Sequence, residues 1–173
     1  MSIGDGRANN NNTININRMY GYGMASTEGT LTNNGTINLT NGGYGIMGES
    51  GESFNNKDAT ITITGTPNMQ NSYGMSMQDG TAKNFGQIDV TGGSVDSKTY
   101  GISVNGGNGL NHGLINMHSD NAFGLFDEGD GEITNVAGGT INLYGNNSVG
   151  MQTTSGKAEN FGTINIGVDN GTG

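Results

Sequence analysis

One short phrase, Gly-Thr-Ile-Asn-Leu at residues 35–39, recurs along the chain and constrains its fold more than any other feature. The central isoleucine of the phrase returns at intervals of 23 to 27 residues. The positions that it marks are Ile14, Ile37, Ile61, Ile88, Ile115, Ile141 and Ile164. A fixed period of this length is typical of repeat architectures, in which each repeat packs only on its neighbours. We therefore expect residues 1–173 to form a single repeat domain.

Two further marks run in step with these anchor isoleucines. A glycine between an aromatic or apolar residue and a second apolar residue, as in Tyr44-Gly45-Ile46, follows each of the first six anchors, and segments such as Leu31-Thr32-Asn33 precede them. Each repeat thus holds three short segments in which apolar and polar residues alternate, which predicts β-strands. Gly, Asn and Thr are poor helix formers. The chain is predicted to be all-β, a right-handed parallel β-helix with three short strands per coil and six to seven coils of 22–29 residues.

Period-two alternation also predicts which side chains face the interior. Ile37 and Leu39 are expected to point inward, and Thr36 and Asn38 outward. By the same rule, Tyr44 and Ile46 should both point inward and Gly45 outward. A row of asparagines is expected at a corner of the coil, tolerating left-handed φ and bonding to the asparagines above and below. These are Asn33, Asn84, Asn111, Asn135 and Asn160.

Two insertions lengthen adjacent repeats at the same place in the coil. They cover residues 65–72, which include the single proline, and residues 92–99. In a regular stack they would form one raised patch, and such protrusions are commonly where repeat proteins bind.

The composition excludes several classes of partner. A formal charge of −9 and a sequence pI near 4.3 disfavour nucleic acid and anionic membrane surfaces. The absence of cysteine removes disulfides and thiolate metal sites. No apolar run is long enough to insert into a membrane. The start, Met-Ser-Ile-Gly-Asp-Gly, lacks the features of a signal peptide, so we expect either an internal protein or a piece of a longer one.

Few residues suggest chemistry. Residues 127–132, Asp-Glu-Gly-Asp-Gly-Glu, contain the ligand types that Ca²⁺ prefers, but their spacing matches no known calcium loop, and a solvated acidic loop is expected instead. His112 and His118 have no evident partner, and Arg7 and Arg18 lie in the first coil. The outward strand positions carry Thr, Asn and Ser, so no catalytic, cofactor-binding or metal-binding residue is assigned and no enzyme activity is expected.

The repeat grammar, seen at residues 158–166 as Ala-Glu-Asn-Phe-Gly-Thr-Ile-Asn-Ile, resembles the passenger regions of bacterial type V autotransporter adhesins, particularly those of fusobacteria. The resemblance implies a β-helix displayed on the bacterial cell surface by a parent protein anchored in the outer membrane. It also implies adhesion to host cells or to other bacteria. The repeat fixes no binding residue.

We therefore expect a structural and adhesive passenger segment whose lateral loops contact a protein or glycan receptor on another cell. One alternative is a glycan-active β-helix enzyme, such as a lyase or depolymerase, which would require three or more charged groups converging in a lateral cleft. A second is a self-assembling fibre subunit, because neither residues 1–12 nor residues 167–173 contain a capping helix, so that the terminal coils could stack end to end.

Overall fold

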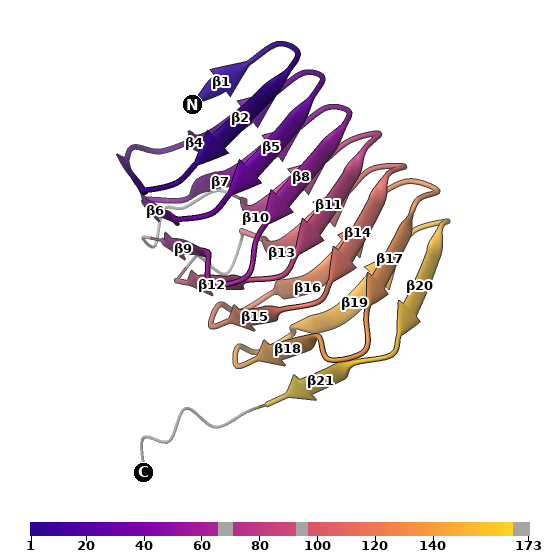
Figure 1. Ribbon diagram of the computed structural model, residues 1–173. Coiled ribbons are helices and arrows are strands. Elements are labelled where there is room, and N and C mark those ends of the chain that lie inside the picture. Colours follow the sequence, from indigo (N-terminus) through magenta and orange to yellow (C-terminus); the bar gives the residue numbers. More distant parts are fainter. Residues whose placement is uncertain (66–70, 93–96, 168–173) are drawn as a thin grey trace.

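The computed structural model describes residues 1–65, 71–92 and 97–167. Within these ranges the chain forms 21 strands and no helix, and the strands pair in parallel. They form three sheets of seven, which we name sheets A, B and C. Each coil contributes one strand to each sheet in turn, and the coils stack into a solenoid (Figure 1). The predicted all-β parallel β-helix with three strands per coil is confirmed.

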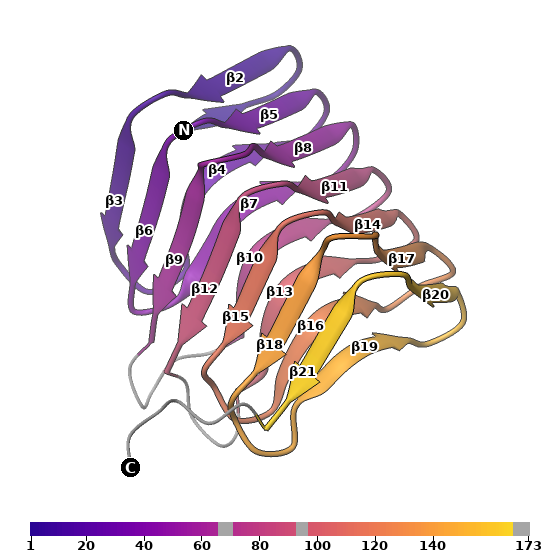
Figure 2. The same ribbon diagram turned by 60° about the horizontal axis from the view of Figure 1, so that its bottom comes forward.

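Sheet A consists of β1 (Ser2–Ile3), β4 (Gly21–Ser26), β7 (Gly43–Gly48), β10 (Ser72–Met77), β13 (Thr99–Val104), β16 (Ala122–Asp127) and β19 (Val149–Thr153). Sheet B consists of β2 (Arg7–Asn10), β5 (Thr30–Asn33), β8 (Glu52–Asn55), β11 (Thr81–Asn84), β14 (Asn108–Asn111), β17 (Glu132–Asn135) and β20 (Lys157–Asn160). Sheet C consists of β3 (Thr13–Asn17), β6 (Thr36–Thr40), β9 (Thr60–Thr64), β12 (Gln87–Thr91), β15 (Leu114–Met117), β18 (Thr140–Leu143) and β21 (Thr163–Ile166). Figure 2 shows sheet C with the first and last coils at opposite ends of the stack.

The anchor isoleucines form one unbroken row along sheet C. Ile14 pairs with Ile37, and the same register continues coil by coil to Ile164. The five inner members of the row have no solvent exposure, whereas Ile14 and Ile164 in the end coils are only partly buried. β-Branched side chains pack well on a pleated surface. The repeated isoleucine is therefore the element that holds successive coils in register around one continuous core.

Tyr44, which precedes the repeated glycine of its coil, points away from the core, contrary to the prediction. Tyr44 lies outside the hydrophobic core and is half-buried, while Gly45 and Ile46 are both buried. Strict alternation fails here because two successive residues turn inward. A Cβ atom on Gly45 would lie 2.4 Å from Cγ2 of Ile61, and the φ of Gly45 is not positive. Close packing against the anchor row, and not a left-handed backbone, explains this glycine.

Asparagines at the ends of the sheet B strands form a continuous hydrogen-bonded ladder, which is buried except at Asn160 in the last coil. Each Nδ2 donates to Oδ1 of the asparagine in the next coil at 2.7 to 2.9 Å. The ladder contains Asn10, Asn33, Asn55, Asn84, Asn111, Asn135 and Asn160. It confirms the predicted ladder and adds Asn10 and Asn55 to it. The predicted left-handed φ is wrong, since none of these residues is among those with positive φ; they end strands in an extended conformation.

Candidate functional site

The outer face of sheet A carries a column of stacked aromatic rings. Neighbouring ring centroids lie 4.6 to 5.3 Å apart, and neighbouring ring planes differ by 5 to 18°. The column contains Tyr22, Tyr44, Tyr73, Tyr100 and Phe123. Its spacing follows the strand spacing of a parallel sheet, because the same position recurs in every coil.

Stacking determines which part of each ring a ligand can reach. The faces of Tyr44, Tyr73 and Tyr100 are covered by their neighbours in the column, so only the ring edges and hydroxyl groups remain available to a ligand. Burial raises the pKa of Tyr73, and a hydrogen bond with Asn71 partly offsets this effect. Burial, followed by the charges of Tyr73 and Glu128, raises the pKa of Tyr100 to about 12. These hydroxyls are therefore neutral at physiological pH and can both donate and accept hydrogen bonds.

A cleft of about 410 Å³ opens beside the middle of this column. It is lined by Asn71, Tyr73, Lys98, Tyr100, Ser103, Phe126 and Glu128. Phe126 is tilted by 48° from Tyr100 and meets Phe123 edge-on, so it does not join the stack. The cleft therefore combines hydroxyl, amide and charged groups with one aromatic ring outside the column, a mixture typical of small-ligand sites.

Two opposite charges line the cleft without pairing with each other. The Lys98 Nζ lies 5.7 Å from the centroid of the Phe123 ring, a cation–π distance. No ion pair involving Lys98 or Glu128 occurs among the residues that the structure describes. Glu128 lies close enough to Tyr73 and Tyr100 to raise the pKa of both phenols, after the larger effect of burial. The cleft thus offers both a cationic donor and an anionic acceptor to a ligand.

The predicted insertions border this cleft. Residues 66–70 and 93–96 lie outside the described residues, but the structure describes the residues that flank both insertions. The Gly65 amide donates to the Thr91 carbonyl at 2.7 Å, and the Lys98 amide donates to Asn71 Oδ1 at 3.0 Å. The described flanks of the two insertions therefore lie at the same corner of adjacent coils, and the predicted raised patch itself lies outside the described residues. Asn71 and Lys98, which line the cleft, belong to these flanks.

The acidic segment 127–132 does not gather its carboxylates. Asp127 is fully buried at the end of β16, accepting hydrogen bonds from the Gly129 amide at 3.1 Å and from Thr153 Oγ1 at 2.9 Å. Glu132 forms an ion pair with Lys157 at 3.4 Å on the outer face of sheet B. The prediction of a solvated loop is wrong for Asp127, because this residue is the last of β16 and its side chain faces the interior of the solenoid. Among the described residues, no group of three or more His, Asp or Glu side chains could hold a metal ion.

The two histidines have aromatic partners, which the sequence alone did not show. His112 stacks on Phe85 with ring centroids 4.6 Å apart, and His118 stacks on Tyr144 at 4.1 Å. Burial, and secondarily the charge of Lys83, lowers the pKa of His112. Each pair lies on successive coils, so these histidines extend the stacking pattern of the solenoid surface.

Charged side chains are sparse in the clefts. Four clefts in the described part of the chain are each lined by one basic and one acidic side chain. The pairs are Arg18 with Glu49, Lys57 with Asp58, Lys98 with Glu128, and Lys83 with Glu132. None of these four clefts assembles the three charged side chains that the enzyme alternative requires.

Comparisons of the chain with protein-family models, curated proteins and solved structures find no match. Across the described residues, the structure contains no helix with the length and apolar character needed to cross a membrane.

Proposed function

We propose that this chain is an adhesive segment of a bacterial cell-surface passenger protein and that it binds a glycan in the sheet A cleft. The observation that carries the proposal is the position of the cleft. It opens where the regular coil is interrupted, between the flanks of two insertions, and its lining comes from three successive coils. Support for surface display comes from the resemblance of the repeat grammar to autotransporter passengers.

The chemistry of the lining favours a sugar as the ligand. Sugars present many hydroxyl groups together with apolar C–H surfaces, and the cleft offers the groups that match both. Tyr100 and Ser103 supply neutral hydroxyls, Asn71 supplies an amide, and Phe126 supplies an aromatic ring that does not join the stack. A chain with a formal charge of −9 repels highly acidic polymers, so a glycan without a high density of negative charge fits best.

The proposal is tested with two matched pairs of variants. The chain is screened against immobilised neutral, amino and acidic oligosaccharides, and the best ligand is titrated by calorimetry. Phe126→Ala and Lys98→Ala each remove one lining group and should weaken binding about tenfold, equivalent to 1.4 kcal/mol. Phe54→Ala and Lys83→Ala remove a half-buried ring and a lysine whose Nζ lies 5.1 Å from the ring centroid, both on the outer face of sheet B. This second pair should leave the affinity unchanged.

The proposal would be contradicted if the chain bound none of the immobilised oligosaccharides. An equal loss of affinity in both pairs of variants would also contradict it, because the binding would then depend on general stability or surface charge and not on the cleft.

A further inference from the structure

Tyr44 of β7 and Tyr73 of β10 form the closest pair of rings in the sheet A column. Their ring centroids are 4.6 Å apart, and their ring planes differ by 8°. The two residues are register partners in adjacent coils, so the spacing of the parallel strands holds the rings at this distance. Tyr22 and Tyr100 stack on the outer faces of the pair, which restricts how far either ring can turn away from the other.

The rings of Tyr44 and Tyr73 also point in the same direction. A hydrogen bond joins their hydroxyl groups. The ring carbons beside the two hydroxyls, Cε1 and Cε2, are therefore neighbours across the stack. These carbons carry much of the unpaired electron of a tyrosyl radical, in orbitals perpendicular to the ring plane. Two nearly parallel rings in contact bring such orbitals face to face, which is the approach that coupling of two radicals requires.

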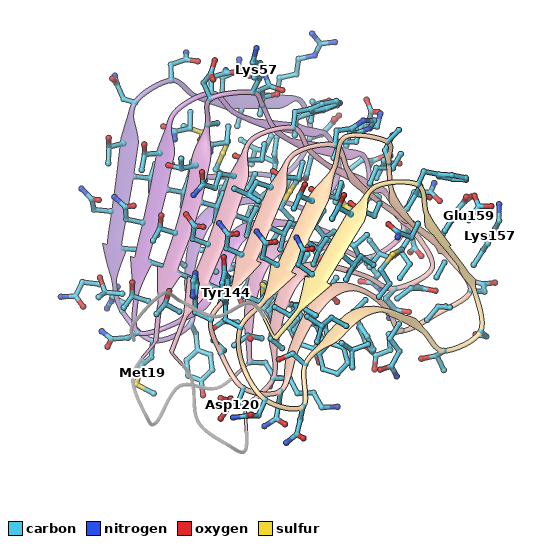
Figure 3. The ribbon with its side chains drawn as sticks, turned by 90° about the horizontal axis from the view of Figure 1, so that it is seen from below. Met19, Lys57, Asp120, Tyr144, Lys157 and Glu159 are labelled. Atoms are coloured by element: carbon cyan, nitrogen blue, oxygen red, sulfur yellow. The ribbon has the colours of Figure 1, made fainter. Side chains whose placement is uncertain are left out.

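The two tyrosines outside the column lack such a partner. Tyr144, labelled in Figure 3, follows β18 and stacks on His118 with ring centroids 4.1 Å apart. Tyr20 is 51% exposed, and it makes no ring contact with another tyrosine in the part of the chain that the structure describes. These two phenols are open to the same oxidants as the column, but only the column places one tyrosine against another.

The pair is accessible to a small oxidant. Tyr44 and Tyr73 are half-buried, so part of each side chain meets solvent. Tyr73 also lines the cleft of about 410 Å³ on sheet A, which is much larger than a molecule of hydrogen peroxide. The two phenols therefore combine a fixed mutual geometry with an open route from solvent.

We propose that Tyr44 and Tyr73 are a site of oxidative cross-linking, at which a haem peroxidase and hydrogen peroxide join the two rings as dityrosine. Hydrogen peroxide takes up two electrons and two protons and is reduced to two waters, while each phenol loses one hydrogen atom and becomes a radical. The two radicals form a carbon–carbon bond between their Cε atoms. Each bonded carbon then gives up its ring proton and each oxygen takes up a proton, which restores both hydroxyl groups.

The product is a covalent staple between β7 and β10, in a chain that has no cysteine for a disulfide. It closes the coil that contains the insertion at residues 65–72. A cross-link of this kind restricts the unfolded chain, as a disulfide does, and so stabilises the fold. The proposal is independent of any ligand in the cleft.

The test is oxidation of the dilute full chain by a haem peroxidase and hydrogen peroxide, followed by isolation of the monomer. Trypsin cleaves after Lys57 and so places Tyr44 and Tyr73 on different peptides. Mass spectrometry should find these peptides joined with the loss of two hydrogen atoms, and dityrosine fluorescence measures the yield. The cross-linked chain should unfold at a higher urea concentration than the untreated chain.

Two double variants each remove two phenols. Tyr44→Phe with Tyr73→Phe keeps the stack of rings but leaves no two tyrosines in contact within the column, so the yield of dityrosine should fall at least about tenfold. Tyr20→Phe with Tyr144→Phe should keep the yield.

A link between Tyr44 and Tyr73 in the monomer, lost in the first double variant and kept in the second, would establish the site. Monomer without dityrosine, a link made chiefly at other tyrosines, or equal losses in the two double variants would overturn the proposal. An unchanged unfolding midpoint of the cross-linked chain would overturn the role as a staple.

Discussion

Gly74 of sheet A packs directly against the anchor residue Ile88 of sheet C across the narrow interior. A Cβ atom on Gly74 would lie 2.5 Å from Cγ2 of Ile88 and 2.5 Å from the carbonyl oxygen of Gly101 in the next coil. The backbone oxygen cannot move without breaking the sheet, and the isoleucine is locked in a core with no solvent exposure. The same relationship recurs coil after coil, which explains why this glycine repeats in step with the isoleucine.

Gly74→Ala is therefore expected to destabilise the protein by about 1–3 kcal/mol through overpacking. Gly4→Ala is the matched control, because its Cβ would meet only Thr27 Oγ1 at 3.9 Å. That variant should change stability by less than about 0.5 kcal/mol. Urea unfolding followed by circular dichroism measures both, and equal midpoints for the two variants would show that the interior has room to spare at Gly74.

The buried asparagine ladder should be costly to interrupt. Asn84 has no solvent exposure, accepts from Asn55 and donates to Asn111. Asn84→Ala leaves both neighbours short of a partner and should cost about 2–6 kcal/mol, since each unsatisfied buried polar group costs about 1–3 kcal/mol. Asn34→Ala interrupts an exposed amide ladder between Asn11 and Asn56 and should cost about 0.5 kcal/mol or less. Comparable losses in the two variants would refute a special role for the buried ladder.

Acidification should weaken the fold through His112. Burial lowers the pKa of His112 in the folded state below its ordinary value of 6.5, with Lys83 adding to the effect. As the pH falls below 6.5, the unfolded chain therefore takes up the proton before the folded chain does, and the free energy of unfolding decreases through that window. His112→Phe keeps a ring against Phe85 and removes the proton uptake. The free energy of unfolding, measured between pH 7 and pH 5, should fall less steeply in this variant than in the wild-type chain. Identical slopes in the two proteins would assign the acid sensitivity to other groups.

Alkaline pH acts on the tyrosine column with the opposite sign. The pKa of Tyr100 is raised from 10.0 to about 12, chiefly by burial. The folded chain keeps this proton while the unfolded chain loses it, so the associated stability is present below pH 10 and is lost as the pH rises toward 12. Absorbance titration should show a phenol that ionises near pH 12 and that disappears in Tyr100→Phe. Ionisation of Tyr100 near pH 10 would mean that its hydroxyl is open to water.

The fold could be predicted from the sequence because the residues that repeat most clearly, the anchor isoleucines, are also the residues that pack successive coils together. The anchor isoleucines, the register between coils, the asparagine ladder and the common corner of the two insertions all follow from one period. The direction of Tyr44 could not be obtained by alternation, since Gly45 and Ile46 are both buried, at a place where Ile61 leaves no room for a Cβ atom on residue 45. Reading down the column of residues that precede the glycine would have revealed five aromatic residues in successive coils.

The candidate cleft was harder to predict. Its lining extends from Asn71 to Glu128, and only the three-dimensional register places Phe126 and Glu128 beside Tyr100. Asp127 and Glu128 are neighbours in an acidic run, yet one is buried in the core and the other lines the cleft. The composition of the acidic run does not tell which of the two carboxylates is buried, because the strand pleat sends adjacent side chains to opposite faces.

The central claim is that the sheet A cleft is the binding site, and nuclear magnetic resonance mapping of the isotope-labelled chain with a bound oligosaccharide tests it most directly. We expect the largest chemical-shift changes at Tyr73, Tyr100, Ser103 and Phe126, with the outer faces of sheets B and C unaffected. Changes centred on sheet C, or on the sheet B pair Phe54 and Lys83, would contradict the account.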